Sequence, residues 1–215
     1  MSVEDIDILY RSRITLLNIL KEDGYDTSQY ENFGPWEITA MAVGNTPLAM
    51  SLTKKQQTGD SPYTKCRVIY SLQKLKQRLQ SFINNLMDPD SPDRVDVKTE
   101  EVIVILLEDV GEVFHKEAFS ALKRHDLKIR FFKAHTLVYD PRSHILVPKH
   151  SKLAASEHAE FLKSNYIRSK SNLPVIRFHE DMIARIMGLV PNDIIKITRP
   201  SPSAGLYDVY RVCMP

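Results

Sequence analysis

The sequence is poor in glycine and cysteine, the two residue types on which many ligand sites depend. Its 215 residues include seven glycines and two cysteines. The glycines form neither a Walker A loop nor a GxGxxG motif, so no loop of the kind that wraps phosphates is apparent. Cys66 and Cys213 lie far apart without a CxxC or Cys–His spacing, which argues against a zinc site and a disulfide framework. We therefore expect a reduced, intracellular protein that holds no metal and needs no cofactor.

Motifs of hydrolytic enzymes and membrane segments are also missing. The sequence contains no HExxH motif and no nucleophile elbow. Its longest aliphatic run, Val102–Leu107, is too short to span a bilayer, and acidic residues occupy the N-terminus where a signal peptide would be apolar. With 43% hydrophobic residues, 26% charged residues and a net charge of +2, the composition is that of an ordinary globular protein. We expect a soluble protein without catalytic residues of its own.

The first 140 residues alternate between helical and strand patterns. Ser2 and Asp5 have the spacing of a capping box, and apolar residues then recur at helical spacing until Gly24. Residues 101–108 contain a continuous aliphatic run, which is typical of a strand covered on both faces. Strands that alternate with helices favour an α/β arrangement. The turn at Asp140–Ser143 then predicts a boundary between two domains, 1–140 and 141–215.

The chain ends with two strand-like runs, Ile194–Thr198 and Leu206–Met214, joined by the connector Arg199–Gly205. Pro200 and Pro202 restrict their own φ angles and disfavour helical backbone in the residues before them. The connector is therefore predicted to be a stiff, shaped loop. Both runs carry apolar residues on both faces, and such strands need cover on both sides. We expect a binding partner to supply part of that cover.

One enzymatic pattern does occur in the sequence. Pro92-Asp93 followed by Asp126-Leu127-Lys128 matches the PD…(D/E)xK arrangement of metal-dependent nucleases. In such enzymes two acids hold Mg²⁺ and the lysine lies near the attacking water. Asp93 belongs to a loop rich in proline and aspartate, where the sequence fixes no geometry, and D-x-K is common by chance. A nuclease-like enzyme that uses Asp93, Asp126 and Lys128 is therefore the alternative hypothesis.

Several motifs of the last third of the chain follow one another in a fixed order. LVPKH (146–150) precedes a helical segment, which is followed by LPVI (173–176), DxxARxxG (181–188) and finally NDIIKITRPSPSAGLYDVYRV (192–212). In this order they resemble the fifth subunit shared by eukaryotic RNA polymerases I, II and III, whose C-terminal domain corresponds to a small subunit of archaeal RNA polymerase. That family often carries glycine at the turn before the closing hairpin. Here Asn192 is expected to replace it, because asparagine tolerates the left-handed conformation.

The resemblance implies an α/β protein of two domains. A jaw domain (1–140) would have a restriction-endonuclease-like fold without nuclease chemistry, and a small assembly domain (141–215) would end in a β-hairpin. The assembly domain would dock on the largest polymerase subunit. The jaw would lie near downstream duplex DNA and bind it weakly, without sequence preference. Such a non-catalytic subunit would be nuclear if a cell encodes it, or would belong to the virion, viral factory or host cytoplasm if a large DNA virus does.

The resemblance also indicates two sets of candidate residues. His115 and Lys116, with Lys123 and Arg124 as secondary candidates, would lie close to DNA phosphates, and solvated surface charge is the alternative reading for them. The candidate subunit interface lies around the closing hairpin and comprises Pro148, His150, Arg199, Ser201, Ser203, Gly205, Tyr210 and Arg211.

Overall fold

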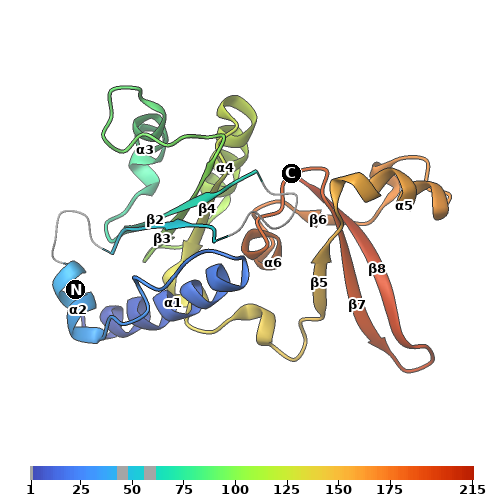
Figure 1. The fold of residues 1–215 in the computed structure, drawn as a ribbon, viewed down its shortest axis with the longest axis horizontal. Helices are drawn as coiled ribbons and strands as arrows, with labels where there is room; N and C mark the ends of the chain where they lie inside the picture. The colour runs from blue at the N-terminus through green and yellow to red at the C-terminus, as the bar shows by residue number, and fades with distance from the viewer. Residues whose placement is uncertain (1, 43–47, 56–61) are drawn as a thin grey trace. The chain divides into compact units, whose positions relative to one another are not determined.

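The computed structural model describes residues 2–42, 48–55 and 62–215 of the chain. The chain divides into two compact units, Met1–Asp140 and Pro141–Pro215. Each unit combines helices with a four-stranded sheet (Figure 1), so the predicted α/β fold class is confirmed. Among the described residues, no helix has both the length and the apolar character that crossing a bilayer requires.

The first unit contains a mixed sheet in the order β1-β2-β3-β4. β1 (Met50–Thr53) runs antiparallel to β2 (Lys65–Ser71), whereas β2, β3 (Glu100–Leu106) and β4 (Ile129–Lys133) are parallel to one another. All seven residues of β3 are buried, which confirms the prediction that this strand is covered on both faces. The helical elements of this unit are α1 (Val3–Glu22), α2 (Pro35–Ala42), η1 (Lys76–Arg78), α3 (Leu79–Met87), α4 (Glu112–His125) and η2 (Ala134–Leu137). Figure 1 shows α1 on one side of the sheet and α3 with α4 on the other.

The N-terminus of α1 has the predicted capping box. The Ser2 hydroxyl accepts a hydrogen bond from the Asp5 amide at 3.1 Å, and the Asp5 carboxylate accepts one from the Ser2 amide at 2.9 Å. Both interactions satisfy amide groups that the first turn of a helix leaves without intrahelical partners. The helix ends at Glu22, and Gly24 follows it with a φ of 89°, which glycine adopts without steric cost. Local chemistry therefore determines both ends of this helix.

The second unit contains a sheet in the order β5-β7-β8-β6. β7 (Ile194–Ser201) and β8 (Gly205–Met214) form an antiparallel pair at its centre. β5 (Lys149–Lys152) joins β7 antiparallel, and β6 (Val175–Arg177) joins β8 in parallel. The helical elements of this unit are η3 (Pro141–Ser143), η4 (Ala155–Glu157), α5 (His158–Ser164), η5 (Lys170–Asn172) and α6 (Met182–Ile186).

One face of this second sheet is covered by its own unit. Ile194 on β7 and Val212 on β8 are fully buried, and Phe161 and Leu162 of α5 pack against them. The ring of Phe161 lies 4.3 Å from the ring of Tyr210, measured between centroids. At the base of the hairpin, α5 of the same unit therefore supplies part of the cover that these strands need.

The connector of the hairpin is shorter than predicted. β7 extends to Ser201 and β8 begins at Gly205, so Pro200 pairs with Leu206 inside the two-stranded ladder. The fixed φ of proline is compatible with an extended strand at an edge, and the local sequence alone does not distinguish that case from a loop. Gly205 has a φ of 70° at the turn. Asn192 has a φ of 74°, which confirms the left-handed conformation expected at the turn before β7.

Candidate functional site

The residues of the predicted subunit interface lie on three strands of the second unit. Pro148 directly precedes β5, and His150 lies on β5, where it pairs with Ile197 of β7. Arg199 and Ser201 lie on β7, Ser203 lies in the turn, and Gly205, Tyr210 and Arg211 lie on β8. The sheet thus brings all eight residues into one unit. It does not bring them onto one exposed surface.

Several of these side chains bond within the unit. The Ser201 hydroxyl accepts a hydrogen bond from the Ala204 amide at 3.3 Å and therefore shapes the turn. Arg211 donates from Nη1 to the Val175 carbonyl at 3.2 Å, which ties β8 to β6. Tyr210 packs on Phe161 of α5. These contacts stabilise the hairpin in its folded conformation. A partner that binds there would therefore meet a surface that is already formed.

The part of the hairpin that extends beyond β5 and β6, residues 199–207, is called the arm here. Its exposed apolar side chains are Leu206, with 70% of its surface accessible, and Tyr207, with 42%. Sequence reasoning missed both as contact residues, because it assigned them to the two faces of a covered strand. Large apolar side chains on a two-stranded projection gain little burial from their own unit. The arm is therefore a candidate surface for a protein contact.

An ion pair locks the two strands of the hairpin together. Asp208 lies 2.8 Å from Lys196 Nζ and accepts a hydrogen bond from the Thr198 hydroxyl at 2.7 Å. The hydrogen bond from Lys196 contributes most to lowering the pKa of Asp208, and the hydrogen bond from Thr198 adds to it. The same ion pair raises the pKa of Lys196. The three residues lie on one face of neighbouring strands. This pair fixes the register at the point where the arm begins.

The candidate DNA-facing residues lie at opposite ends of α4. His115 and Lys116 are in its first half, whereas Lys123 and Arg124 are in its last turn. At about 1.5 Å per residue, Lys116 and Lys123 are separated by roughly 10 Å along the helix axis. Lys116 forms an ion pair with Glu112 at 2.7 Å, and this contact lowers the pKa of Glu112. The four side chains therefore form no compact cluster, and Lys116 is already balanced by a carboxylate.

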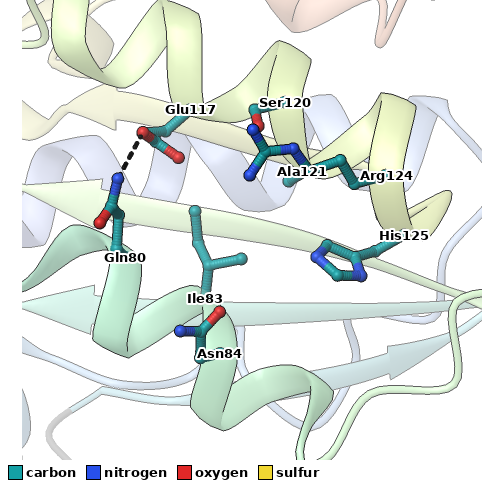
Figure 2. A pocket seen from close by; sticks show the side chains of 8 residues that line it. All are labelled: Gln80, Ile83, Asn84, Glu117, Ser120, Ala121, Arg124 and His125. Atoms are coloured by element: carbon teal, nitrogen blue, oxygen red, sulfur yellow. Dashed lines mark hydrogen bonds between the residues drawn. The ribbon is translucent and has the colours of Figure 1, made fainter.

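Arg124 lines a small cavity between α3 and α4, which Figure 2 shows from close by. The cavity measures about 160 Å³ and is lined by Gln80, Ile83, Asn84, Glu117, Ser120, Ala121, Arg124 and His125. Gln80 donates to Glu117 at 3.3 Å across the gap between the helices (Figure 2). Because a carboxylate and a guanidinium share this cavity, its charge is mixed.

The residues of the nuclease-like pattern have structural roles. Asp126 ends α4 in the left-handed conformation, with a φ of 54°, and its amide donates to the Leu122 carbonyl at 3.1 Å. Lys128 is bound to Glu101, with 2.8 Å between Nζ and Oε2. Asp93 lies in the loop after α3, where its backbone carbonyl accepts from Arg67 at 2.7 Å. Within the described parts of the chain, no group of three or more acidic, histidine or cysteine side chains is arranged to hold a metal ion. The nuclease hypothesis is not supported.

Glu101 is the centre of a buried polar cluster that the sequence did not reveal. Its side chain is 6% exposed and contacts Lys128 at 2.8 Å and Arg130 at 3.0 Å. The Tyr25 hydroxyl donates to the same carboxylate at 2.9 Å. Burial alone would raise the pKa of Glu101, but Arg130 and Lys128 outweigh it and lower the pKa to about 2. Burial contributes most to raising the pKa of the Tyr25 hydroxyl, and the carboxylate of Glu101 adds to it.

Comparison with known proteins gives a consistent result for both units. A family model described as "RNA polymerase Rpb5, C-terminal domain" matches residues 139–213. Over 214 residues the chain is 30% identical to "DNA-directed RNA polymerases I, II, and III subunit rpabc1" of Dictyostelium discoideum, covering 99% of this chain and 100% of that protein. It is 27% identical over 210 residues to the RPABC1 subunit of Caenorhabditis elegans, covering 95% of this chain and 94% of the relative.

An archaeal relative matches a shorter part of the chain. "DNA-directed RNA polymerase subunit Rpo5" of Sulfurisphaera tokodaii is 47% identical over 72 residues, which are 34% of this chain and 83% of the relative. The aligned length is close to the size of the unit Pro141–Pro215. The two eukaryotic relatives match almost the whole chain at lower identity.

Proposed function

Since the chain belongs to the Rpb5 family of DNA-directed RNA polymerase subunits, we propose that it is a non-catalytic subunit whose two units have separate tasks. The assembly domain, residues 141–215, attaches the chain to the largest polymerase subunit. The jaw domain, residues 1–140, lies beside downstream duplex DNA. The chain itself needs no metal or cofactor for either task.

The exposed arm is the observation that carries this proposal. Leu206 and Tyr207 project from a hairpin whose base is already packed by α5, so a further contact surface remains after the unit has folded. Removing such apolar surface from water contributes about 25 cal/mol per Å² of burial. Arg199, at the start of the arm, adds guanidinium donors for a partner's carbonyl or carboxylate groups. A polymerase subunit with an apolar and acidic surface fits this combination.

Co-purification tests the assembly role. The full chain, carrying an affinity tag and expressed in its own cellular or viral system, is expected to recover the large polymerase subunits in equal amounts. A nuclear location is expected if a cell encodes the chain, and a location in virions, viral factories or host cytoplasm if a virus does. Recovery of the tagged chain without large subunits would overturn the assembly role. Dialysis against EDTA should leave the recovered complex intact.

Duplex binding tests the role of the jaw domain. We expect weak binding without sequence preference, with an observed affinity that falls steeply as salt rises, because phosphate contacts release counterions. Fluorescence anisotropy with labelled duplexes of two unrelated sequences measures this. Arg124→Ala should weaken binding more than Lys116→Ala, since Lys116 is already paired with Glu112. Equal binding at low and high salt would contradict the proposal.

A further inference from the structure

The outer edge of β8 can be identified from two backbone hydrogen bonds. The Val212 amide donates to the Pro174 carbonyl at 2.9 Å, toward β6, whereas the Cys213 amide donates to the Asp193 carbonyl at 2.8 Å, on the side of β7. Backbone groups alternate in direction along a strand. The amides and carbonyls of Leu206, Asp208 and Tyr210 therefore point away from β7, on the same side as those of Val212.

This outer edge is open along most of its length. β6 pairs only with Val212–Met214, at the far end of β8. Among the described residues, the outward amides and carbonyls of Leu206 and Asp208 have no backbone partner. An unpaired row of this kind is a template for another strand.

Three other strand edges, on β1, β5 and β7, have features that protect them from pairing. The Tyr30 hydroxyl bonds both the carbonyl and the amide of Ser51 on β1, at 3.2 and 3.1 Å. On β5 the edge sequence KHSK presents lysines, which discourage pairing. On the outer side of β7, Pro200 has no amide hydrogen to offer. The segment of β8 between Gly205 and Tyr210 contains neither proline nor lysine, so it has none of these protections.

We propose that an extended segment of a neighbouring polymerase subunit adds as a strand to the edge of β8 at Leu206–Tyr210. This inference rests on the proposed function and specifies how the arm binds. Backbone hydrogen bonds supply affinity in strand addition, and side chains beside the strand supply specificity. The added strand would place an apolar side chain next to Leu206 and a hydrogen-bond donor next to Asp208.

A second copy of this chain fits the edge poorly. An antiparallel pairing of two identical edges would be centred near Asp208 and would place the two Asp208 carboxylates opposite each other. Like charges directly opposite one another destabilise a strand pair. Each carboxylate is also already engaged by Lys196 and Thr198 of its own hairpin. A different chain is therefore the better occupant.

Two substitutions at one position isolate the outward amide. Asp208→Ala and Asp208→Pro both remove the carboxylate and its contacts with Lys196 and Thr198, but only proline removes the amide hydrogen. Proline is tolerated in a strand where the amide points outward from an edge, so both variants should fold. Thermal unfolding of each full-length variant provides the check on folding.

The assay is competition between each tagged variant and the untagged chain for incorporation into polymerase. Asp208→Pro is expected to be incorporated at least ~10-fold less well than Asp208→Ala, which corresponds to one lost backbone hydrogen bond and its crowding. Equal incorporation of the two variants, while the unmodified chain co-purifies normally, would overturn strand addition and leave the assembly role standing. Failure of the unmodified chain to co-purify would overturn both.

Hydrogen exchange gives a second readout that needs no substitution. In assembled polymerase, the Leu206 and Asp208 amides of the unmodified chain should exchange at least ~10-fold more slowly than in the free chain. Unchanged exchange at these two amides would overturn the inference. So would a dimer of the free chain that protects the same amides, because the occupant would then be a second copy.

Discussion

Replacing Glu101 by glutamine should destabilise the first unit strongly. The substitution keeps the size of the side chain and an oxygen that can accept from Tyr25, but removes the charge that balances Lys128 and Arg130. Leaving a buried charge without its partner costs about 3 to 5 kcal/mol. The pKa of Glu101 gives a second route to the magnitude. Its fall from 4.5 to about 2 corresponds to roughly 3 kcal/mol of stability at neutral pH.

The sign of the pH dependence follows from the same pKa. Because the folded pKa of Glu101 is lower than 4.5, the unfolded chain binds the proton first as the pH falls. The stabilisation is therefore complete above pH 4.5 and is lost progressively between pH 4.5 and about 2. In the Glu101→Gln variant this position no longer titrates. Its contribution to the pH dependence of stability in that window should disappear.

Urea unfolding at pH 7, monitored by hydrogen exchange at the β3 amides, isolates the stability of the first unit from that of the second. A loss of about 3 kcal/mol is expected for Glu101→Gln. Glu112→Gln is the matched control, because it removes the same charge from an exposed pair with Lys116 and should change little. A loss below about 1 kcal/mol for Glu101→Gln would refute the reasoning, since an unpaired buried charge costs more than that.

Three further predictions concern the second unit. Burial contributes most to lowering the pKa of His158, and the adjacent Lys170 adds to it, so the folded state favours the neutral ring. The melting temperature should therefore fall as the pH drops below 6.5. A rise in the melting temperature over that range would contradict this prediction. Tyr166 has a φ of 56° and its side chain is 95% exposed. Tyr166→Gly should therefore stabilise the unit by about 1 kcal/mol, because glycine adopts the left-handed conformation without strain. A lower melting temperature of this variant would refute the prediction. Tyr210→Asp, which places a carboxylate against Phe161, should disturb the assembly domain and reduce incorporation into polymerase more than Lys116→Ala does. Equal or reversed effects in co-purification would show that attachment does not depend on this domain.

Local interactions explain which elements the sequence predicts well. The ends of α1 depend on Ser2, Asp5 and Gly24, which act within one helical turn of each end. The burial of β3 follows from its continuous aliphatic run. Asn192 adopts the left-handed conformation because its own side chain tolerates it. In each case the cause lies within a few residues of the effect.

Two geometries of the second unit were not predicted from the sequence, one set by strand pairing and one by the end of a helix. Pro200 suggested a loop, but its pairing with Leu206 places it in an edge strand. Tyr166 takes the position after α5 that glycine usually fills, where the amide of Ile167 donates to the Leu162 carbonyl at 2.9 Å. No local preference of tyrosine indicates this conformation. The order of the motifs identified the family without revealing either geometry.

The Glu101 cluster also explains why a nuclease-like pattern exists in a chain that belongs to a polymerase subunit family. Asp126 is the residue that stops α4, and Lys128 is the cation that neutralises Glu101 at the start of the neighbouring strand. The ammonium group of Lys128 lies 2.8 Å from Glu101 and 4.9 Å from the centroid of the Tyr63 ring. It is therefore held between a carboxylate and an aromatic face. Orienting a metal-bound water would require breaking the ion pair and would leave Glu101 buried beside fewer cations. The spacing D-x-K in this chain is therefore accounted for by the packing of α4, β3 and β4, and Glu101→Gln tests that packing directly.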